Sequence, residues 1–194
     1  SKIFVSSDSE KVIKICKKKK YTHKIDVPFK RPKNISGNKS PISKTIIHVL
    51  NYYKKNKMEF DYFILLEPTS PIRFRYDVDN AINKFLKKAR YYDSIVSIGE
   101  IKISPFLFKY EYRNKIKNLF NLKKNNLNRQ NFKKVYFPFG VIYLSKVNTY
   151  LKYKNFYNRK TMFYKIKTSQ CYEIDDIYDF MCVQTVIKKI GKLW

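Results

Sequence analysis

The chain has 194 residues, of which 44% are hydrophobic, and carries a formal net charge of +27. This length and apolar content suit a single domain that buries a sizeable core. The three cysteines lie far apart without the paired spacing of a disulfide framework or a zinc site, so we expect a reducing compartment and a cytoplasmic protein. The apolar runs are too short to span a bilayer.

A strong positive charge can indicate a nucleic-acid partner. Only seven of the 42 basic residues are arginine, however, and the 35 lysines are spread through nearly every segment beside many Asn, Ile and Tyr residues. A nucleic-acid reader gathers its basic residues on one face, whereas this spread indicates a general drift in residue usage. Nucleic-acid binding therefore stays an alternative and not the expected function.

The first part of the chain predicts strands and helices in alternation. Residues 2–6 are expected to form a strand, followed by a short helix with Val12, Ile13 and Cys16 on its apolar side. Residues 21–29 favour an extended segment, and residues 30–41 a polar loop. A second helix follows, and its apolar face comprises Ile42, Ile46, Val49, Leu50 and Tyr53.

A buried strand over residues 61–66 ends in a loop at residues 67–73. Pro68 and Pro71 fix two backbone φ angles and remove two hydrogen-bond donors, so neither helix nor sheet continues through the loop. After it, Asp77 is expected to cap an amphipathic helix. Ligands in open α/β sheets bind just beyond the carboxyl ends of the strands, where this loop lies. The alternative, that the prolines only stiffen a connection, stays open at this point.

The second half adds a strand at residues 93–98 and then an inserted arm at residues 103–131, which we predict to be a β-hairpin turning at residues 113–115. Its exposed aromatic residues would need a partner surface. Two further strands and a helix over residues 176–190 complete the chain. The alternation predicts an α/β fold with a mostly parallel sheet and helices on both faces.

Two carboxylates precede the last helix in an extended segment. Glu173 and Asp175 are expected to point to one side while Ile174 anchors the other, because alternate residues of an extended chain share a side. Two carboxylates suit Mg²⁺, which takes its remaining ligands from water and phosphates. Helix capping is the alternative, and it is the expected role of Asp176 and Asp179.

Arginine is scarce among the lysines, so Arg31, Arg73 and Arg129 stand out as candidate anion ligands, with a chance surface position as the alternative for each. His23 and His48 have no acid, serine or cysteine neighbour that would mark a catalytic triad, so both are expected to be structural. Without a nucleophile, direct phosphoryl or nucleotidyl transfer is favoured over covalent catalysis.

Five motifs then occur in order along the chain. They are Ile-Phe-Val-Ser-Ser-Asp at 3–8, Phe-Lys-Arg-Pro at 29–32, Leu-Glu-Pro-Thr-Ser-Pro-Ile-Arg at 66–73, Phe-Pro-Phe-Gly-Val-Ile-Tyr at 137–143 and Glu-Ile-Asp-Asp at 173–176. In this order they resemble the CMP-sugar synthetases, the acylneuraminate cytidylyltransferase family, over nearly the whole length. The run at 66–73 is the most specific of the five.

The resemblance implies a Rossmann-like, GT-A-like three-layer nucleotidyltransferase fold. It implies transfer of CMP from CTP to an acidic nonulosonic sugar of the sialic, legionaminic or pseudaminic acid type, with release of pyrophosphate, for cell-surface glycan biosynthesis. The implied nucleotide-binding residues are Arg31, Asn38, Lys39 and Ser40. The implied sugar-binding residues are Glu67, Thr69, Ser70, Arg73, Arg129, Gln130, Phe139 and Gly140. The implied catalytic residues, which would also hold Mg²⁺, are Glu173 and Asp175. The arm at 103–131 would form a homodimer and bring Arg129 and Gln130 to the partner's sugar site.

The chain departs from the family pattern at two kinds of position. Glu67 stands where glutamine is common and Phe139 where many members have asparagine, so the resemblance leaves the sugar unidentified. The family's first strand and its basic Gly/Ser loop, which wraps the triphosphate, would precede the first matched segment. We therefore expect the 194 residues to be a fragment or a degenerate copy, with activity in a longer chain. A non-catalytic nucleotide-binding or assembly module is the main alternative.

Overall fold

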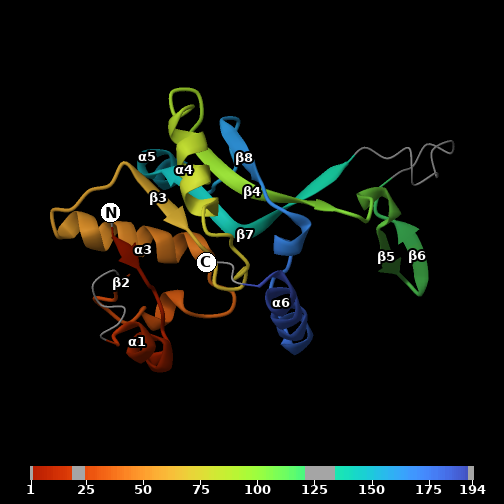
Figure 1. Cartoon of the computed structure of the whole chain (residues 1–194), viewed down its shortest axis with the longest axis horizontal. Helices are drawn as coiled ribbons and strands as arrows, with labels where there is room; N and C mark the ends of the chain where they lie inside the picture. The colour runs from red at the N-terminus through yellow and green to blue at the C-terminus, as the bar shows by residue number, and fades with distance from the viewer. Residues whose placement is uncertain (1, 19–24, 121–133, 192–194) are drawn as a thin grey trace. The chain divides into compact units, whose positions relative to one another are not determined.

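The computed structural model describes residues 2–18, 25–120 and 134–191 of the chain (Figure 1). These residues form two compact units, Ser1–Asp61 and Tyr62–Trp194, and each is described by itself. The expectation of a single domain stays a prediction. Within the described residues, no helix has the length and the apolar character that a membrane crossing requires.

The first unit contains the strands and helices that the sequence predicts, with shorter strands. β1 (Ile3–Phe4) pairs in parallel with β2 (Ile25–Asp26), and α1 (Glu10–Cys16) connects them. A 3₁₀ turn, η1 (Lys33–Ile35), lies in the predicted polar loop before α3 (Ile42–Lys55). The predicted extended segment and the polar loop are therefore both present.

Aromatic rings hold this unit together. Phe29 packs edge-on against His48, with 4.7 Å between ring centroids, and against Tyr52 at 4.9 Å. Phe4 of β1 contacts Phe29 and Tyr53. His48 thus has the structural position expected for it, whereas His23 lies outside the described residues.

The second unit is built on a four-stranded sheet in the order β3-β7-β4-β8. Its strands are β3 (Tyr62–Leu65), β7 (Val135–Lys146), β4 (Ser94–Ile101) and β8 (Thr161–Lys165). β7 runs antiparallel to both of its neighbours, while β4 and β8 are parallel. The sheet is therefore mixed and not mostly parallel as expected. β7 returns beside β4 after the inserted arm, and this return gives the antiparallel direction.

Helices cover both faces of this sheet. α4 (Asp77–Leu86) places Phe85 in a buried cluster with Ile95, Leu144 and Met162. On the opposite face, Tyr150 of α5 (Val147–Tyr153) contacts Phe63 and Phe156. The sequence did not predict α5, which has only 7 residues. The α/β class with helices on both faces is thus confirmed for this unit.

α4 begins one residue earlier than a cap at Asp77 requires. Its N-cap is Tyr76, which makes no side-chain capping bond, and Asp77 is the first helical residue. The Asp77 carboxylate instead accepts a hydrogen bond from the backbone N of Phe74 at 2.6 Å. The predicted capping role is therefore wrong, because this buried side chain faces the preceding loop.

The remaining elements of this unit are the inserted arm and the C-terminal helix with the turn before it. η2 (Pro105–Leu107) leads into the hairpin of β5 (Lys109–Tyr112) and β6 (Lys115–Asn118), which Figure 1 shows beyond the ends of β4 and β7. The hairpin turns where the sequence predicted. η4 (Thr168–Gln170) precedes α6 (Ile177–Ile190), whose Val183 packs on the buried Ile72 of the 67–73 loop.

Candidate functional site

Three separate segments of the second unit meet at one carboxylate oxygen. The Ser70 hydroxyl donates to Glu173 Oε1 at 2.8 Å, and the backbone N–H of Gly140 donates to the same oxygen at 2.9 Å. Ser70 is fully buried and Glu173 half-buried. We call Ser70, Gly140 and Glu173 the carboxylate junction. It joins the third, fourth and fifth sequence motifs.

The extended chain around Glu173 explains why this carboxylate faces inward. Ile174 packs into the cluster of Ile72 and Val183, and its backbone N donates to the carbonyl of Thr69 at 2.8 Å. Because successive residues of an extended chain point to opposite sides, Glu173 is directed away from that cluster toward Gly140. The predicted anchoring role of Ile174 is confirmed.

Glycine is required at position 140 by the close approach of the 67–73 loop. A Cβ atom there would lie 2.1 Å from Glu67 Oε2 and 2.8 Å from Ser70 Oγ. The backbone N–H of Glu67 also donates to the Gly140 carbonyl at 3.0 Å. The loop therefore lies directly on β7, with Glu67 beside the junction.

Arg73 binds the backbone of the site. Its Nε donates to the carbonyl of Val141 at 2.8 Å, and its Nη2 donates to the carbonyls of Glu67 at 2.7 Å and Gly140 at 3.2 Å. The guanidinium thus joins the end of β3 to β7. Its predicted role as a sugar ligand stays a prediction, but these three bonds give Arg73 a clear structural role.

Negative charge gathers at this site. Burial raises the pKa of Glu67, the nearby Glu173 raises it further, and the Arg73 guanidinium acts in the opposite direction. Burial also raises the pKa of Tyr143, with Tyr157, Glu67 and Glu173 contributing. Glu67 therefore takes up a proton at a higher pH than an ordinary glutamate.

Sequence reasoning missed the two tyrosines of this site. Burial raises the pKa of Tyr157, and the charges of Glu67 and Glu173 add to that increase. Tyr143 ends the fourth motif and alternates with the buried Ile142, which is a signal that could have found it. Tyr157 lies in a loop without a motif, and no signal in the sequence pointed to it.

The predicted nucleotide ligands all lie in the first unit, in the 31–40 loop. Arg31 Nη2 donates to Asp8 Oδ1 at 2.7 Å and its Nε donates to Ser36 Oγ at 3.2 Å. The hydrogen bond from Arg31 holds the pKa of Asp8 below its usual value. This ion pair joins the first and second motifs. Asn38 and Lys39 are exposed, and Ser40 Oγ is buried without a hydrogen-bond partner among the described residues.

The remaining predicted site residues differ in their positions. Phe139 is buried in the core with Val141 and Ile142, so its side chain packs away from solvent. Thr69 and Asp175 are exposed. Arg129 and Gln130 lie outside the described residues.

Asp176 and Asp179 have the capping roles expected for them at the start of α6. Asp176 Oδ1 accepts the backbone N–H groups of Tyr178 and Asp179 at 2.8 Å and 2.9 Å. Asp179 Oδ2 accepts in return from the backbone N of Asp175 and Asp176. These two aspartates are thus used by the helix start, and the ligand-binding role of Glu173 and Asp175 stays a prediction.

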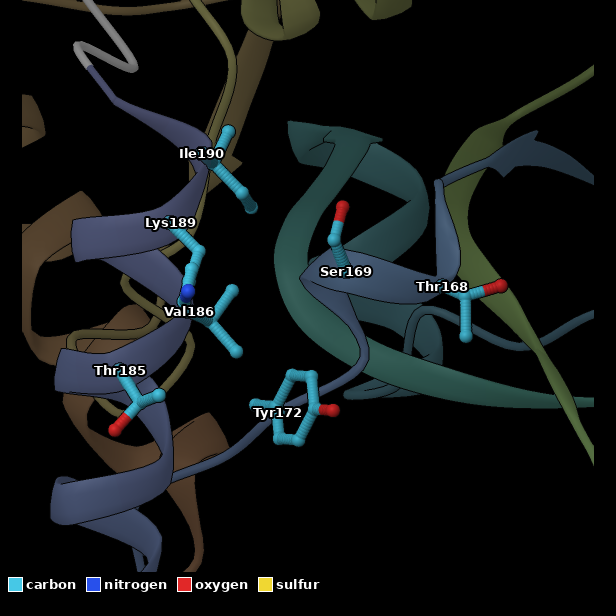
Figure 2. Close-up of a pocket in the computed structure, with 7 residues that line it drawn as sticks. All are labelled: Thr168, Ser169, Tyr172, Thr185, Val186, Lys189 and Ile190. Carbon is cyan, nitrogen blue, oxygen red and sulfur yellow. The ribbon is translucent and has the colours of Figure 1, made fainter.

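A separate hollow of about 290 Å³ lies between η4 and α6 in the same unit (Figure 2). Its lining residues are Thr168, Ser169, Tyr172, Thr185, Val186, Lys189 and Ile190. Figure 2 shows the Tyr172 side chain between α6 and η4, and this residue precedes Glu173 in the extended segment. Since neighbouring residues there point to opposite sides, the hollow and the carboxylate junction are distinct.

Comparisons with known proteins agree with the family that the motifs resemble. The chain is 28% identical over 182 residues to the N-acylneuraminate cytidylyltransferase of Streptococcus agalactiae serotype III (strain NEM316), a match that covers 93% of this chain and 41% of the relative. It is 25% identical over 164 residues to the CMP-N,N'-diacetyllegionaminic acid synthase of Legionella pneumophila subsp. pneumophila, covering 82% of this chain and 66% of that one. The chain thus spans less than half of the streptococcal relative. No family model matches it.

The fold is also that of a solved enzyme structure. CMP:2-keto-3-deoxy-manno-octonic acid synthetase complexed with CTP superposes with a TM-score of 0.63 at 11% sequence identity. The match covers 98% of this chain and 82% of that structure. At this identity the likeness concerns the fold alone. The curated relatives support the CMP-sugar synthetase family as the one that the chain resembles.

Proposed function

We propose that this relative of the CMP-sugar synthetases forms part of an enzyme that transfers CMP from CTP to an acidic nonulosonic sugar and releases pyrophosphate. The carboxylate junction is the observation that carries the proposal. It brings together three motifs that lie far apart in the chain. Ser70 and Glu173, for example, are 103 positions apart. The names of the relatives describe the same class of reaction.

The proposed reaction is a direct displacement at phosphorus. The anomeric hydroxyl oxygen of the sugar forms a bond to the α-phosphorus of CTP, and the bond from that phosphorus to the β-phosphate oxygen breaks. Pyrophosphate leaves with the electron pair, and the hydroxyl proton is released. Positioning and neutralisation of charge supply most of the catalysis in such transfers, and no covalent enzyme intermediate is needed.

We assign the sugar side of the reaction to the 67–73 loop and its surroundings. Glu67, Thr69 and Ser70 lie in that loop, and Gly140 faces it from β7. Tyr143 and Tyr157 add two hydroxyl groups beside the carboxylates. A small number of placed polar groups of this kind can fix the orientation of a polyhydroxylated ligand. Arg129 and Gln130 keep their proposed sugar contacts from the resemblance.

Mg²⁺ is the proposed metal, held by Glu173 and Asp175. Among the described residues no group of three or more His, Cys, Asp or Glu side chains could hold a metal ion. Two carboxylates fit Mg²⁺, because it takes its other ligands from water and substrate phosphates. Within the described residues, the two donors of the junction both bind Oε1 of Glu173. When bound, the ion would neutralise the charge of the phosphates.

The nucleotide side is assigned to the first unit. Arg31, Asn38, Lys39 and Ser40 form its proposed contacts with CTP. The Asp8 ion pair fixes the Arg31 guanidinium, and the unpartnered Ser40 hydroxyl has a free hydrogen-bonding capacity. A buried polar atom without a partner is costly unless a ligand satisfies it, which supports a ligand at this loop.

The inserted arm supports a proposed homodimer. The residues of β5 and β6 are all exposed, and large apolar side chains continue on both sides of the hairpin. The exposed members are Ile103, Phe106, Leu107, Phe108, Tyr110, Tyr112, Ile116, Leu119 and Phe120. Apolar side chains gathered in this way indicate an interaction surface. The proposed location is the cytoplasm, in agreement with the three unpaired cysteines.

The test of the proposal is pyrophosphate release by the full-length protein. We expect release that requires both CTP and one sugar acid from a panel of sialic, legionaminic and pseudaminic acids, together with Mg²⁺. UTP in place of CTP serves as the nucleotide control and should give no release. Release with no member of the panel would contradict the proposal and favour a non-catalytic binding module.

A further inference from the structure

We propose that Gln170 and Asp77 are positioning residues that hold Ser70 in place beside Glu173. Their structural effect stands by itself, and their effect on turnover rests on the proposed function. Both side chains are buried, with Gln170 only 1% exposed and Asp77 8% exposed. Neither was singled out as a site residue in the sequence.

Gln170 joins the two segments that meet at the junction. Its Nε2 donates to the carbonyl of Ile72 at 3.2 Å and to Asp77 Oδ2 at 2.6 Å. Its Oε1 accepts the backbone N–H of Lys167 at 3.0 Å. All parts of this buried amide are therefore used, and fully satisfied buried networks fix one conformation.

Asp77 extends the network to the sheet and to the loop. Oδ2 accepts from Gln170 and from the backbone N of Phe74, and Oδ1 accepts from the hydroxyl of Tyr164 on β8 at 2.9 Å. The carboxylate thus holds the end of the loop, the start of α4 and β8 together. A buried carboxylate needs several hydrogen-bond donors, because burying it without them costs free energy.

The order of these contacts along the chain gives the mechanism of positioning. The loop is fixed to the later segment twice, by Ile72 with Gln170 and by Thr69 with Ile174. The Ser70–Glu173 contact lies between these two fixed points. Loss of the Gln170 amide removes one of them, so Ser70 can move relative to Glu173 while Thr69 stays attached.

The structural test uses hydrogen exchange at Gly140, whose N–H donates to Glu173. The chain contains four glycines, so labelling with [¹⁵N]glycine gives a spectrum with few amide signals. In Gln170→Leu, which keeps the size but removes the amide, we expect exchange at Gly140 to accelerate about tenfold relative to Gly99 in β4. Gly99 reports opening of the same sheet and serves as the internal reference.

Ser94→Ala is the matched control. Ser94 is fully buried in β4, and its hydroxyl donates to the carbonyl of Phe156, on the other side of the sheet from α4. We expect this variant to leave the ratio of Gly140 to Gly99 exchange unchanged. If Gln170→Leu does not fold, Tyr164→Phe removes a single bond to Asp77 and should change the ratio in the same direction by a smaller factor. An unchanged ratio in the folded variant overturns the proposal.

The kinetic test separates positioning from general stability. In the full-length protein, Gln170→Leu should lower kcat about tenfold or more with little change in the KM for CTP, because small displacements at a reacting centre are costly. Adding Ser70→Ala should leave little further loss, since Gln170 is proposed to act through the same Ser70–Glu173 contact. Independent, multiplicative losses would overturn the proposal. If the unaltered protein releases no pyrophosphate, the proposed function is wrong. The hydrogen-exchange result at Gly140 still tests whether Gln170 positions Ser70.

Discussion

Two proline-containing loops, one in each unit, both present an arginine, yet they use it differently. In the 67–73 loop, Arg73 donates to three backbone carbonyls and lies half-buried. In the 31–40 loop, Arg31 pairs with Asp8, whose side chain is 47% exposed. Arg73 therefore belongs to the scaffold of its loop, whereas Arg31 is held by another side chain and keeps its charge near solvent.

An arginine in a sequence motif is therefore not by itself evidence of a substrate-binding residue. Backbone carbonyls fix a guanidinium in one geometry, and lysine cannot reproduce several such bonds. An exposed ion pair contributes little to stability and can exchange its partner for a ligand. The following changes test the comparison from the largest expected effect to the smallest.

Arg73→Lys should lower the free energy of unfolding by about 3 kcal/mol, because it breaks hydrogen bonds from a charged donor to partly buried carbonyls. Arg31→Lys keeps an ion pair with Asp8 and should change it by less than about 0.5 kcal/mol. Urea denaturation followed by circular dichroism measures both. Equal losses for the two variants would remove the distinction between the loops.

Gly140→Ala should cost about 2 kcal/mol, because the new Cβ would overlap Glu67 and Ser70 and force the loop away from β7. Gly37→Ala is the counterpart in the other loop. Nothing lies within 4 Å of a Cβ at Gly37, so its effect should stay within about 0.5 kcal/mol. A tolerated Gly140→Ala would show that the 67–73 loop is not packed on β7 as described.

The two loops should also respond to pH in opposite directions. The pKa of Glu67 is raised in the folded state, so its ionisation weakens folding as pH rises above the ordinary value of 4.5. Glu67→Gln should therefore stabilise the protein more at pH 7 than at pH 4, by on the order of 1 kcal/mol or less after solvent screening.

The ionisation of Asp8 affects stability in the opposite direction, because it favours folding. Its pKa is lowered in the folded state, so its contribution is present above the ordinary value of 3.8 and is lost as the pH falls through the folded value. Asp8→Asn should therefore destabilise the protein at pH 7 and have less effect at pH 3. Urea titrations at several pH values measure both variants, and changes of the same sign would count against the described charges.

The fold was predictable where the local pattern carried the information. α6 and its capping aspartates follow from apolar spacing and an acidic start, and the arm hairpin turns at Arg113 and Asn114, which both have positive φ angles. The direction of β7 was not predictable, because alternation is the same in parallel and antiparallel strands. The predicted capping role of Asp77 was wrong for a similar reason, since the sequence does not show where a buried carboxylate points.

The candidate site was predictable through motif order and not through spacing. Ser70, Gly140 and Glu173 came from three motifs, and the structure brings them to one oxygen. Tyr157 and Gln170 gave no sequence signal, because their positions depend on contacts between distant segments. The structural role of Arg73 was also hidden, since its partners are backbone carbonyls, which every residue has.

The catalytic role of Glu173 is tested most directly by the kcat for pyrophosphate release of Glu173→Gln in the full-length protein. Glutamine keeps an oxygen for Ser70 and Gly140, so the loop stays in place and only the charge is lost. Glu59→Gln, at an exposed surface pair with Lys54, is the matched control. We expect kcat to fall about 100-fold or more for Glu173→Gln and to stay unchanged for Glu59→Gln. Equal kcat values for Glu173→Gln and the unaltered enzyme would contradict the catalytic role of Glu173.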